Sequence, residues 1–83
     1  MLHDADRIRM QHMLEAAREA VAYASGRSRC DLDTDRQLMH SMVRCIEIIG
    51  EAANRVSADC QAAHPDLGWQ DMIGMRIRLA HGY

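Results

Sequence analysis

The chain contains no phenylalanine and only one proline among its 83 residues, and it has few residues that favour strands. Alanine, methionine, leucine, isoleucine, arginine and glutamate are plentiful, and these are good helix formers. The composition therefore predicts an all-α protein. Eighty-three residues allow one domain, residues 1–83. So short a chain buries only about 60% of its unfolded surface, which makes a partner chain helpful for stability.

Several other absences exclude whole classes of protein. Cys30, Cys45 and Cys60 are an odd number of cysteines without a C-x-x-C pair, and no charged-then-apolar signal segment begins the chain. This pattern favours reduced thiols in the cytoplasm over a disulfide framework. No apolar run approaches the ~20 residues of a membrane span, so we expect no membrane contact. The five histidines form no H-E-x-x-H pair, and we expect neither a metal nor a cofactor.

The charge balance argues against general attraction to nucleic acid. The formal net charge is −2, so any RNA contact would have to come from a local cluster such as Arg76 and Arg78. An RNA-cutting enzyme needs only transient contact, and the acidic balance therefore counts only mildly against one.

The N-terminal segment predicts a helix from about Asp4 to Ser25. Acidic Asp4 and Asp6 suit the positive end of the helix dipole, and Gly26 is the expected stop. The apolar residues expected to face the core follow three-and-four spacing: Met10, Met13, Leu14, Ala17, Val21 and Ala24. Residues 26–29 then read as a solvated basic loop.

A second long helix is predicted to open near Asp33 or Thr34. Its apolar residues form two adjacent stripes, one of Leu38, Met42, Cys45, Ile49, Ala52 and Val56 and the other of Met39, Val43, Ile46, Gly50 and Ala53. So wide an apolar surface implies packing on two sides, as in a central bundle helix or a helix at a dimer interface.

The segment after this helix is harder to assign. Residues 57–63 either continue this helix or form a short separate one. Pro65 must end any helix here, because proline disfavours helical conformation at the preceding residue, His64. We expect His64 in a surface turn. A last helix is predicted to begin at Trp69, whose indole is expected to serve packing. The apolar residues of this helix that we expect to face the core are Met72, Ile73 and Leu79.

The last eight residues carry the candidate chemistry. Arg76 and His81 supply a permanent cation and a group that titrates near neutral pH, and Tyr83 adds a phenol that can be modified. A guanidinium can hold a phosphate while an imidazole moves a proton, which suffices for phosphodiester cleavage without a metal. The spacing alone is common by chance, and taken by itself it favours a solvated helix end over a catalytic site.

Helical geometry separates these residues. Arg76 and Tyr83 lie within roughly 20° of one face, whereas Arg76 and His81 are about 140° apart around the axis. Either the long arginine side chain reaches round the helix, or a second subunit supplies the missing group. Glu51 lies between Gly50 and Ala52, small residues that let another helix approach, so it is expected to be partly buried and to support the site. Glu47 is expected at the surface. The partner of Glu51 is either Arg76 or, at i+4, Arg55.

Three segments together resemble a known family. They are Cys45-Ile-Glu-Ile-Ile-Gly-Glu-Ala-Ala-Asn-Arg55, His64-Pro-Asp-Leu-Gly-Trp69, and Gly74-Met-Arg76 leading to Arg76-x4-His81-x-Tyr83. In this order they resemble the HepT-like family of small helical HEPN-domain proteins over nearly the whole chain. The resemblance implies an up-and-down helical bundle of the four-helix type, completed by dimerisation across a shared cleft. Homodimers or higher even oligomers are therefore expected.

The resemblance also implies a function. Members are toxins of type VII toxin–antitoxin systems that act as metal-independent endoribonucleases. Carried onto this chain, His81 would be the general acid or base and Arg76 would stabilise charge on the phosphorane. The partner antitoxin, an MntA-like minimal nucleotidyltransferase, would silence the RNase by transferring AMP to Tyr83. AMP would add bulk and negative charge where the RNA phosphate must sit.

Two departures keep other interpretations open. Ile77 stands where the family commonly has Asn or Asp after the motif arginine, and the chain stops at Tyr83 where members usually continue into a further helix, as if truncated. One alternative is a non-catalytic helical subunit that a minimal nucleotidyltransferase binds or modifies. Another is a structural dimer fragment with a vestigial motif.

Overall fold

The computed structural model describes residues 3–82, and for residues 3–79 it also describes the side chains. Five helices make up this part of the chain, with no strand among its residues: α1 (Asp4–Ala24), α2 (Arg29–Thr34), α3 (Arg36–Arg55), α4 (Ala58–Ala63) and α5 (Trp69–Gly82). The predicted all-α helical bundle is confirmed.

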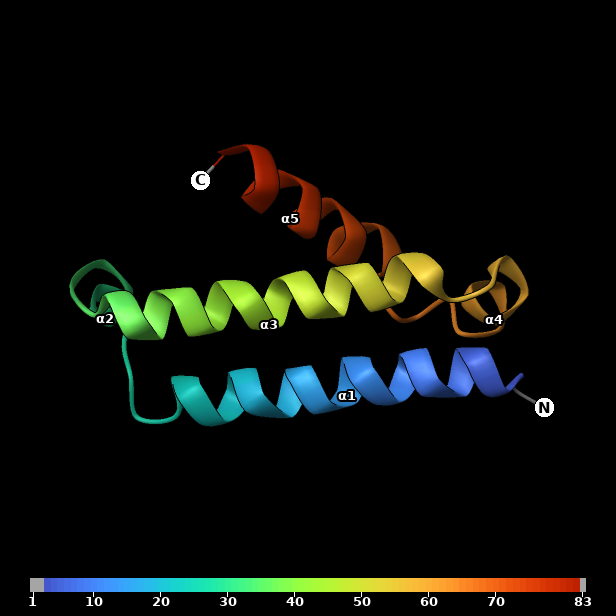
Figure 1. The fold of residues 1–83 in the computed structure, drawn as a ribbon, viewed down its shortest axis with the longest axis horizontal. Helices are drawn as coiled ribbons and strands as arrows, with labels where there is room; N and C mark the ends of the chain where they lie inside the picture. Colours follow the sequence, from blue (N-terminus) through green and yellow to red (C-terminus); the bar gives the residue numbers. More distant parts are fainter. Residues whose placement is uncertain (1–2, 83) are drawn as a thin grey trace.

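The two long helices form the body of the molecule. Helices α1 and α3 run antiparallel and side by side, and α5 crosses the other side of α3 at an angle (Figure 1). The short helices α2 and α4 lie at opposite ends of α3 (Figure 1). The result is elongated, with extents of 43 × 25 × 19 Å. Because both α1 and α5 contact α3, this helix is central, which is one of the two arrangements that its apolar stripes predicted.

The turn between α1 and α3 differs from the prediction. Gly26 has φ +72°, a left-handed conformation that glycine adopts without strain, and α1 ends just before it as expected. The expected start of the second helix at Asp33 or Thr34 is wrong, because these residues complete the extra helix α2. Asp35 instead caps α3, where its carboxylate accepts a hydrogen bond of 3.1 Å from the backbone N–H of Leu38.

The core gathers where α1, α3, α4 and α5 meet. Its buried members are Met13, Ala52, Ala53, Val56, Cys60 and Trp69, and Met10, Met72 and Ile73 pack against them. The prediction that Leu14 and Val21 belong to this core is wrong, since they are 44% and 72% exposed. Helix α1 meets α3 through Met13 and Ala16, which leaves Leu14 and Val21 on its flank.

The segment after α3 forms the separate short helix α4. Ser57 caps it, with its hydroxyl accepting a hydrogen bond of 3.2 Å from the N–H of Cys60. Asp6, only 5% exposed, accepts bonds of 2.8 and 2.7 Å from the backbone N–H and hydroxyl of Ser57. These hydrogen bonds hold the pKa of Asp6 below its usual range. The Asp6–Ser57 pair therefore ties the start of α1 to the α3–α4 junction.

The turn before α5 matches its prediction. His64 is exposed, and its carbonyl accepts a hydrogen bond of 2.9 Å from the indole Nε1–H of Trp69. The Trp69 side chain is 7% exposed, so it serves packing as expected. The indole thus fixes the point at which α5 leaves the core.

Candidate active site

The candidate site begins where α5 crosses α3, at Gly50. A methyl group on Gly50 would lie 2.5 Å from Cβ of Arg76 and 2.7 Å from the carbonyl oxygen of Met72. Both distances are far shorter than a carbon atom tolerates, and the second involves backbone that no rotamer change can move. Only glycine fits here. The absence of a side chain at Gly50 therefore determines how closely Arg76 lies on α3.

Arg76 is held by this contact while its charged end stays available. Its Cβ and Cδ lie against Gly50, and the residue is half-buried. No ion pair to Arg76 is formed by any side chain in residues 3–79. A long side chain that packs its stem and leaves its guanidinium unpaired is well suited to receive an anion.

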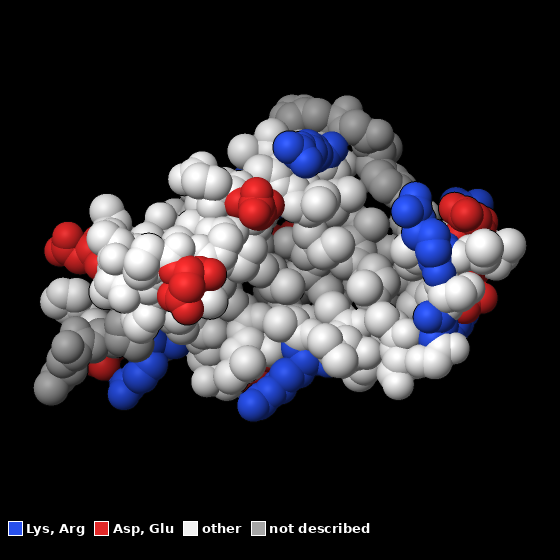
Figure 2. Space-filling view, turned by 180° about the vertical axis from the view of Figure 1, so that it is seen from behind, with Lys and Arg blue, Asp and Glu red and all other residues white. Residues whose placement is uncertain are grey.

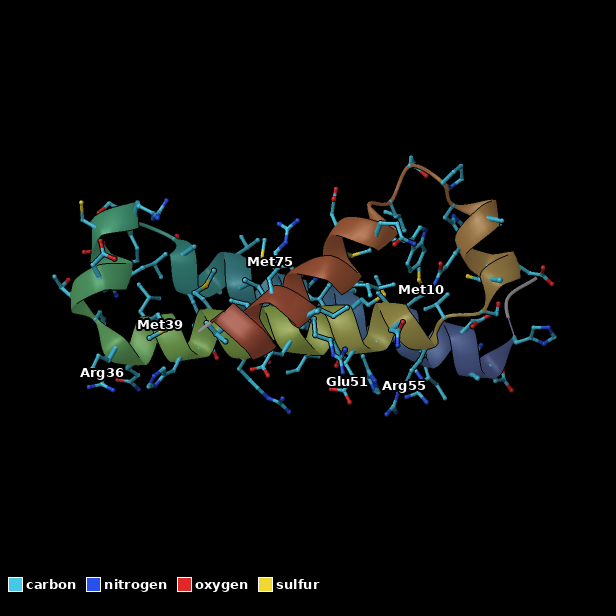
Figure 3. The ribbon with its side chains drawn as sticks, turned by 90° about the horizontal axis from the view of Figure 1, so that it is seen from above. Met10, Arg36, Met39, Glu51, Arg55 and Met75 are labelled. Carbon is cyan, nitrogen blue, oxygen red and sulfur yellow. The ribbon has the colours of Figure 1, made fainter. Side chains whose placement is uncertain are left out.

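Glu51 follows one of the two alternatives left open by the sequence. Its carboxylate lies 3.6 Å from the guanidinium of Arg55, with 48% of the Glu51 side chain exposed. Figure 3 shows Glu51 and Arg55 projecting from the same side of α3. The expected partial burial of Glu51 is wrong, because its neighbour Gly50 faces α5 and turns Glu51 toward solvent. Glu47, expected at the surface, is half-buried. A supporting role for Glu51 stays a prediction.

The other two predicted site residues lie at the edge of what the structure describes. Helix α5 continues through His81 to Gly82, so Arg76 and His81 share one continuous helix, about 140° apart around its axis. The His81 side chain and all of Tyr83 lie outside the described residues. The meeting of Arg76 with His81 and Tyr83 is therefore still a prediction.

Apolar side chains surround the motif arginine on α5. Met75 is 42% exposed and Ile77, in the position where a polar residue was expected, is 47% exposed. Figure 2 shows that uncharged side chains cover most of the hollowed face formed by α1, α3 and α5, with charges mainly at its edges. Exposed apolar side chains such as Met75 and Ile77 are typical of protein interfaces.

The described residues contain neither a metal-binding cluster nor a membrane-spanning helix. Among them, no group of three or more His, Cys, Asp or Glu side chains is arranged to hold a metal ion. None of the helices in the described part of the chain is long and apolar enough to cross a membrane.

The sequence analysis did not predict the Asp6–Ser57 contact, and it only partly identified the close approach of two helices at Gly50. Asp6 was assigned to the helix dipole, yet its main role is the long-range pair with Ser57, and no local pattern marks a contact across 51 positions. Gly50 was recognised only as a small residue that lets a helix approach. A glycine inside an otherwise strong helix is the signal that identifies such a close crossing.

Comparison with known proteins identifies the family. Residues 13–83 match the family described as ribonuclease HepT-like. A protein of Thermococcus cleftensis named "Probable ribonuclease HepT" is 36% identical over 53 residues, which cover 64% of this chain and 48% of that protein. A protein of Methanocaldococcus jannaschii with RNase in its name is 27% identical over 86% of this chain and 65% of its own length.

A third relative has a similar name and covers more of this chain. A protein of Caldanaerobacter subterraneus, also named as an RNase, is 31% identical over 89% of this chain and 66% of its own length. The chain thus spans about half to two thirds of the length of these curated relatives. No solved structure matches significantly. With the ordered motifs, the all-α fold and the match over residues 13–83, the chain belongs to the ribonuclease HepT-like family.

Proposed function

We propose that the protein is the RNA-cutting toxin of a type VII toxin–antitoxin pair and acts in the cytoplasm. The observation that carries this proposal is the placement of Arg76, whose stem is seated on Gly50 and whose guanidinium has no ion-pair partner among the described side chains. Membership of the ribonuclease HepT-like family supports the same activity.

The proposed reaction is a metal-independent transesterification within the RNA chain. The ribose 2′-oxygen attacks the adjacent phosphorus and loses its proton to a general base, while the bond from phosphorus to the 5′-oxygen breaks and that oxygen receives a proton. The products are a 2′,3′-cyclic phosphate and a 5′-hydroxyl. His81 acts as general acid or base, and the Arg76 guanidinium stabilises the negative charge that builds up on the phosphorane.

The separation of Arg76 from His81 favours a shared site in a homodimer or higher even oligomer. Side chains about 140° apart on one straight helix do not converge on a single phosphate without help from a second copy. The exposed Met75 and Ile77 provide apolar surface next to the motif for such a contact. Light scattering is expected to show an even oligomer at micromolar concentration, and a well-folded monomer would contradict this part of the proposal.

Regulation is proposed to act through Tyr83. A cognate MntA-like nucleotidyltransferase antitoxin transfers AMP from ATP to the phenol oxygen, with pyrophosphate as the leaving group. The new phosphodiester carries negative charge close to the position that the RNA phosphate must occupy, and it therefore suppresses cleavage.

A second candidate function is a non-catalytic helical subunit that a minimal nucleotidyltransferase binds or modifies. The apolar Ile77 beside Arg76 favours it, since an exposed isoleucine contributes no hydrogen bond to a phosphate site. The net charge of −2 points the same way.

Cleavage in the presence of EDTA separates the two functions. Labelled RNA incubated with the protein and EDTA is expected to yield fragments that end in a 2′,3′-cyclic phosphate. Arg76→Ala and His81→Ala should each reduce the rate by about 10²- to 10⁴-fold. A requirement for added Mg²⁺, or normal cleavage by His81→Ala, contradicts the proposed mechanism, and absence of any cleavage favours the non-catalytic subunit.

Modification is tested by intact-mass spectrometry with the cognate nucleotidyltransferase, ATP and Mg²⁺. We expect a mass increase of one AMP unit on the wild-type chain and none on Tyr83→Phe, which removes only a hydroxyl group. A persisting mass increase on Tyr83→Phe would move the modification to another residue such as Tyr23.

A further inference from the structure

A second cationic feature lies between α1 and α3, away from the motif on α5. Here the two helices border a hollow of about 220 Å³, whose lining includes Arg9 and His12 from α1 and Arg44 and Arg55 from α3. Ile48 also contributes to the lining. Figure 3 shows Arg55 on one side of the molecule and Met75 on the other. The hollow is therefore distinct from the apolar face beside the motif.

The charges around this hollow do not cancel. Glu51 is the one carboxylate in its lining, and it already pairs with Arg55 at 3.6 Å. Among the side chains of residues 3–79, neither Arg9 nor Arg44 forms an ion pair. Two guanidinium groups are thus left uncompensated at the rim of one hollow, in a protein whose net charge is −2. This local excess of positive charge attracts anions although the whole molecule does not.

The residue type narrows the kind of anion. All ten basic residues of the chain are arginines, including every one in this hollow. A planar guanidinium matches the geometry of phosphate with two parallel hydrogen bonds, and the imidazole of His12 offers a further donor. The hollow therefore suits a phosphate group held between two helices.

The position along α3 connects this hollow with Arg76. The side chain of Arg76 packs against Gly50. The next two residues in the sequence, Glu51 and Ala52, line the hollow. Arg76 and the hollow therefore lie at the same level of α3, on different sides of the helix. A flexible single strand of nucleic acid that crosses this turn of α3 would meet both Arg76 and the arginines of the hollow.

We infer that the hollow of Arg9, His12, Arg44 and Arg55 binds a backbone phosphate of the RNA substrate, outside the cleavage site of Arg76 and His81. This inference rests on the proposed ribonuclease function, because that function supplies the RNA. The site contacts only phosphate, so it strengthens binding without reading the base sequence. Its role is to position the strand, not to take part in bond cleavage.

The test measures binding separately from cleavage. A fluorescent 2′-O-methyl RNA oligonucleotide lacks the attacking hydroxyl, and its anisotropy gives the affinity at a series of KCl concentrations. The double variant Arg9→Gln/Arg44→Gln is expected to bind about tenfold more weakly at low salt. The slope of log K against log salt should become shallower by about 0.7, the value for one lost phosphate contact on a single strand.

A matched control removes two positive charges elsewhere. Arg29→Gln/Arg36→Gln changes the net charge equally, with Arg29 on α2 and Arg36 at the far end of α3 from Arg55 (Figure 3). It should retain the wild-type salt slope. With cleavable RNA, Arg9→Gln/Arg44→Gln should raise KM and leave kcat nearly unchanged, while Arg76→Ala loses kcat and retains most of the slope.

The possible failures are distinguishable. If wild type cleaves RNA but Arg9→Gln/Arg44→Gln keeps its slope and KM, the inferred subsite is wrong and the ribonuclease stands. If these substitutions weaken binding of the nucleotidyltransferase and leave RNA binding intact, the hollow is a protein interface instead. If wild type neither binds nor cleaves RNA, the proposed function fails as well.

Discussion

The two contacts that α3 makes with its long neighbours are built differently. Its contact with α1 extends along most of both helices and depends on interlocking side chains such as Met13, Ala16, Cys45 and Ala52. Its contact with α5 includes a point of close backbone approach, at Gly50. In the α1–α3 contact, many side chains each contribute a small part of the stability. In the α3–α5 contact, one residue, Gly50, determines how closely α5 approaches α3.

This difference separates stability from placement of the motif. A long side-chain interface tolerates one altered residue because the remaining contacts persist. A close helix crossing has no such reserve, because the missing side chain of Gly50 is what lets Arg76 approach α3. Changes in the α1–α3 contact should therefore affect the free energy of unfolding with little effect on activity, while changes at the α3–α5 crossing should affect both.

The largest effect is expected from Gly50→Ala. The new methyl group would clash with Cβ of Arg76 and the carbonyl of Met72, so α5 must move. We expect a loss of about 1–3 kcal/mol in the free energy of unfolding. Displacement of the motif should reduce RNA cleavage about a hundredfold. Urea denaturation and the EDTA cleavage assay measure the two effects.

Gly74→Ala is the matched control on α5. No atom lies within 4 Å of a methyl group placed on Gly74, and its backbone is helical. The substitution should stabilise the protein by up to about 1 kcal/mol, because alanine is the better helix former. Equal loss of activity in Gly74→Ala and Gly50→Ala would show that the crossing does not control the motif.

A smaller effect is expected from Asp6→Asn, which weakens the link between the start of α1 and the end of α3. The substitution removes the charge that accepts two hydrogen bonds from Ser57, and it should lower Tm at pH 7 by several degrees while leaving cleavage nearly unchanged. The exposed Asp4, paired only with Arg7, provides the control Asp4→Asn, for which little change is expected. A large loss of activity in Asp6→Asn would contradict the division of roles.

The Asp6–Ser57 pair also predicts how the Tm difference between wild type and Asp6→Asn depends on pH. The folded-state pKa of Asp6 is lowered, so its stabilising contribution is complete above the ordinary aspartate pKa near ~4 and is lost as pH falls through the lower folded value. The Tm gap between wild type and Asp6→Asn should therefore shrink below about pH 4. A gap that stays constant from pH 7 to pH 3 would exclude the carboxylate as its cause.

The smallest effect concerns the three thiols. Cys45 and Cys60 are 2% and 5% exposed, and burial raises the pKa of both, whereas Cys30 on α2 is exposed. Iodoacetamide should add one adduct to the native protein, at Cys30, and three after denaturation. Early labelling of Cys45 would indicate that the α1–α3 contact opens readily in the native protein.

Much of the fold could be read from local patterns, but contacts between distant residues could not. Gly26, Pro65 and the apolar periodicity correctly marked the ends of α1, the break before α5 and the central place of α3. The extra helix α2 was not predicted, because it depends on a capping contact in which the carboxylate of Asp31 accepts a 2.7 Å hydrogen bond from the N–H of Ser28. Leu14 and Val21 were misplaced because periodicity identifies a face but not its width.

The candidate site shows the same limit. The motif order identified Arg76 as the central residue, and Gly50 was noted as a point of approach. That these two residues touch depends on the crossing of α3 and α5, which no spacing within either helix specifies. The partner of Glu51 likewise depended on which way α3 turns, and the local i+4 arginine proved to be the neighbour.

The Asp6–Ser57 pair also bears on the order of events during synthesis. It joins residues 51 positions apart and closes the α1–α3 hairpin at its open end. The chain leaves the ribosome N-terminus first, so every residue of this hairpin is outside before any part of α5 follows. The surface of α3 around Gly50 is therefore exposed before Arg76 can reach it, and α5 docks onto a hairpin that is already complete.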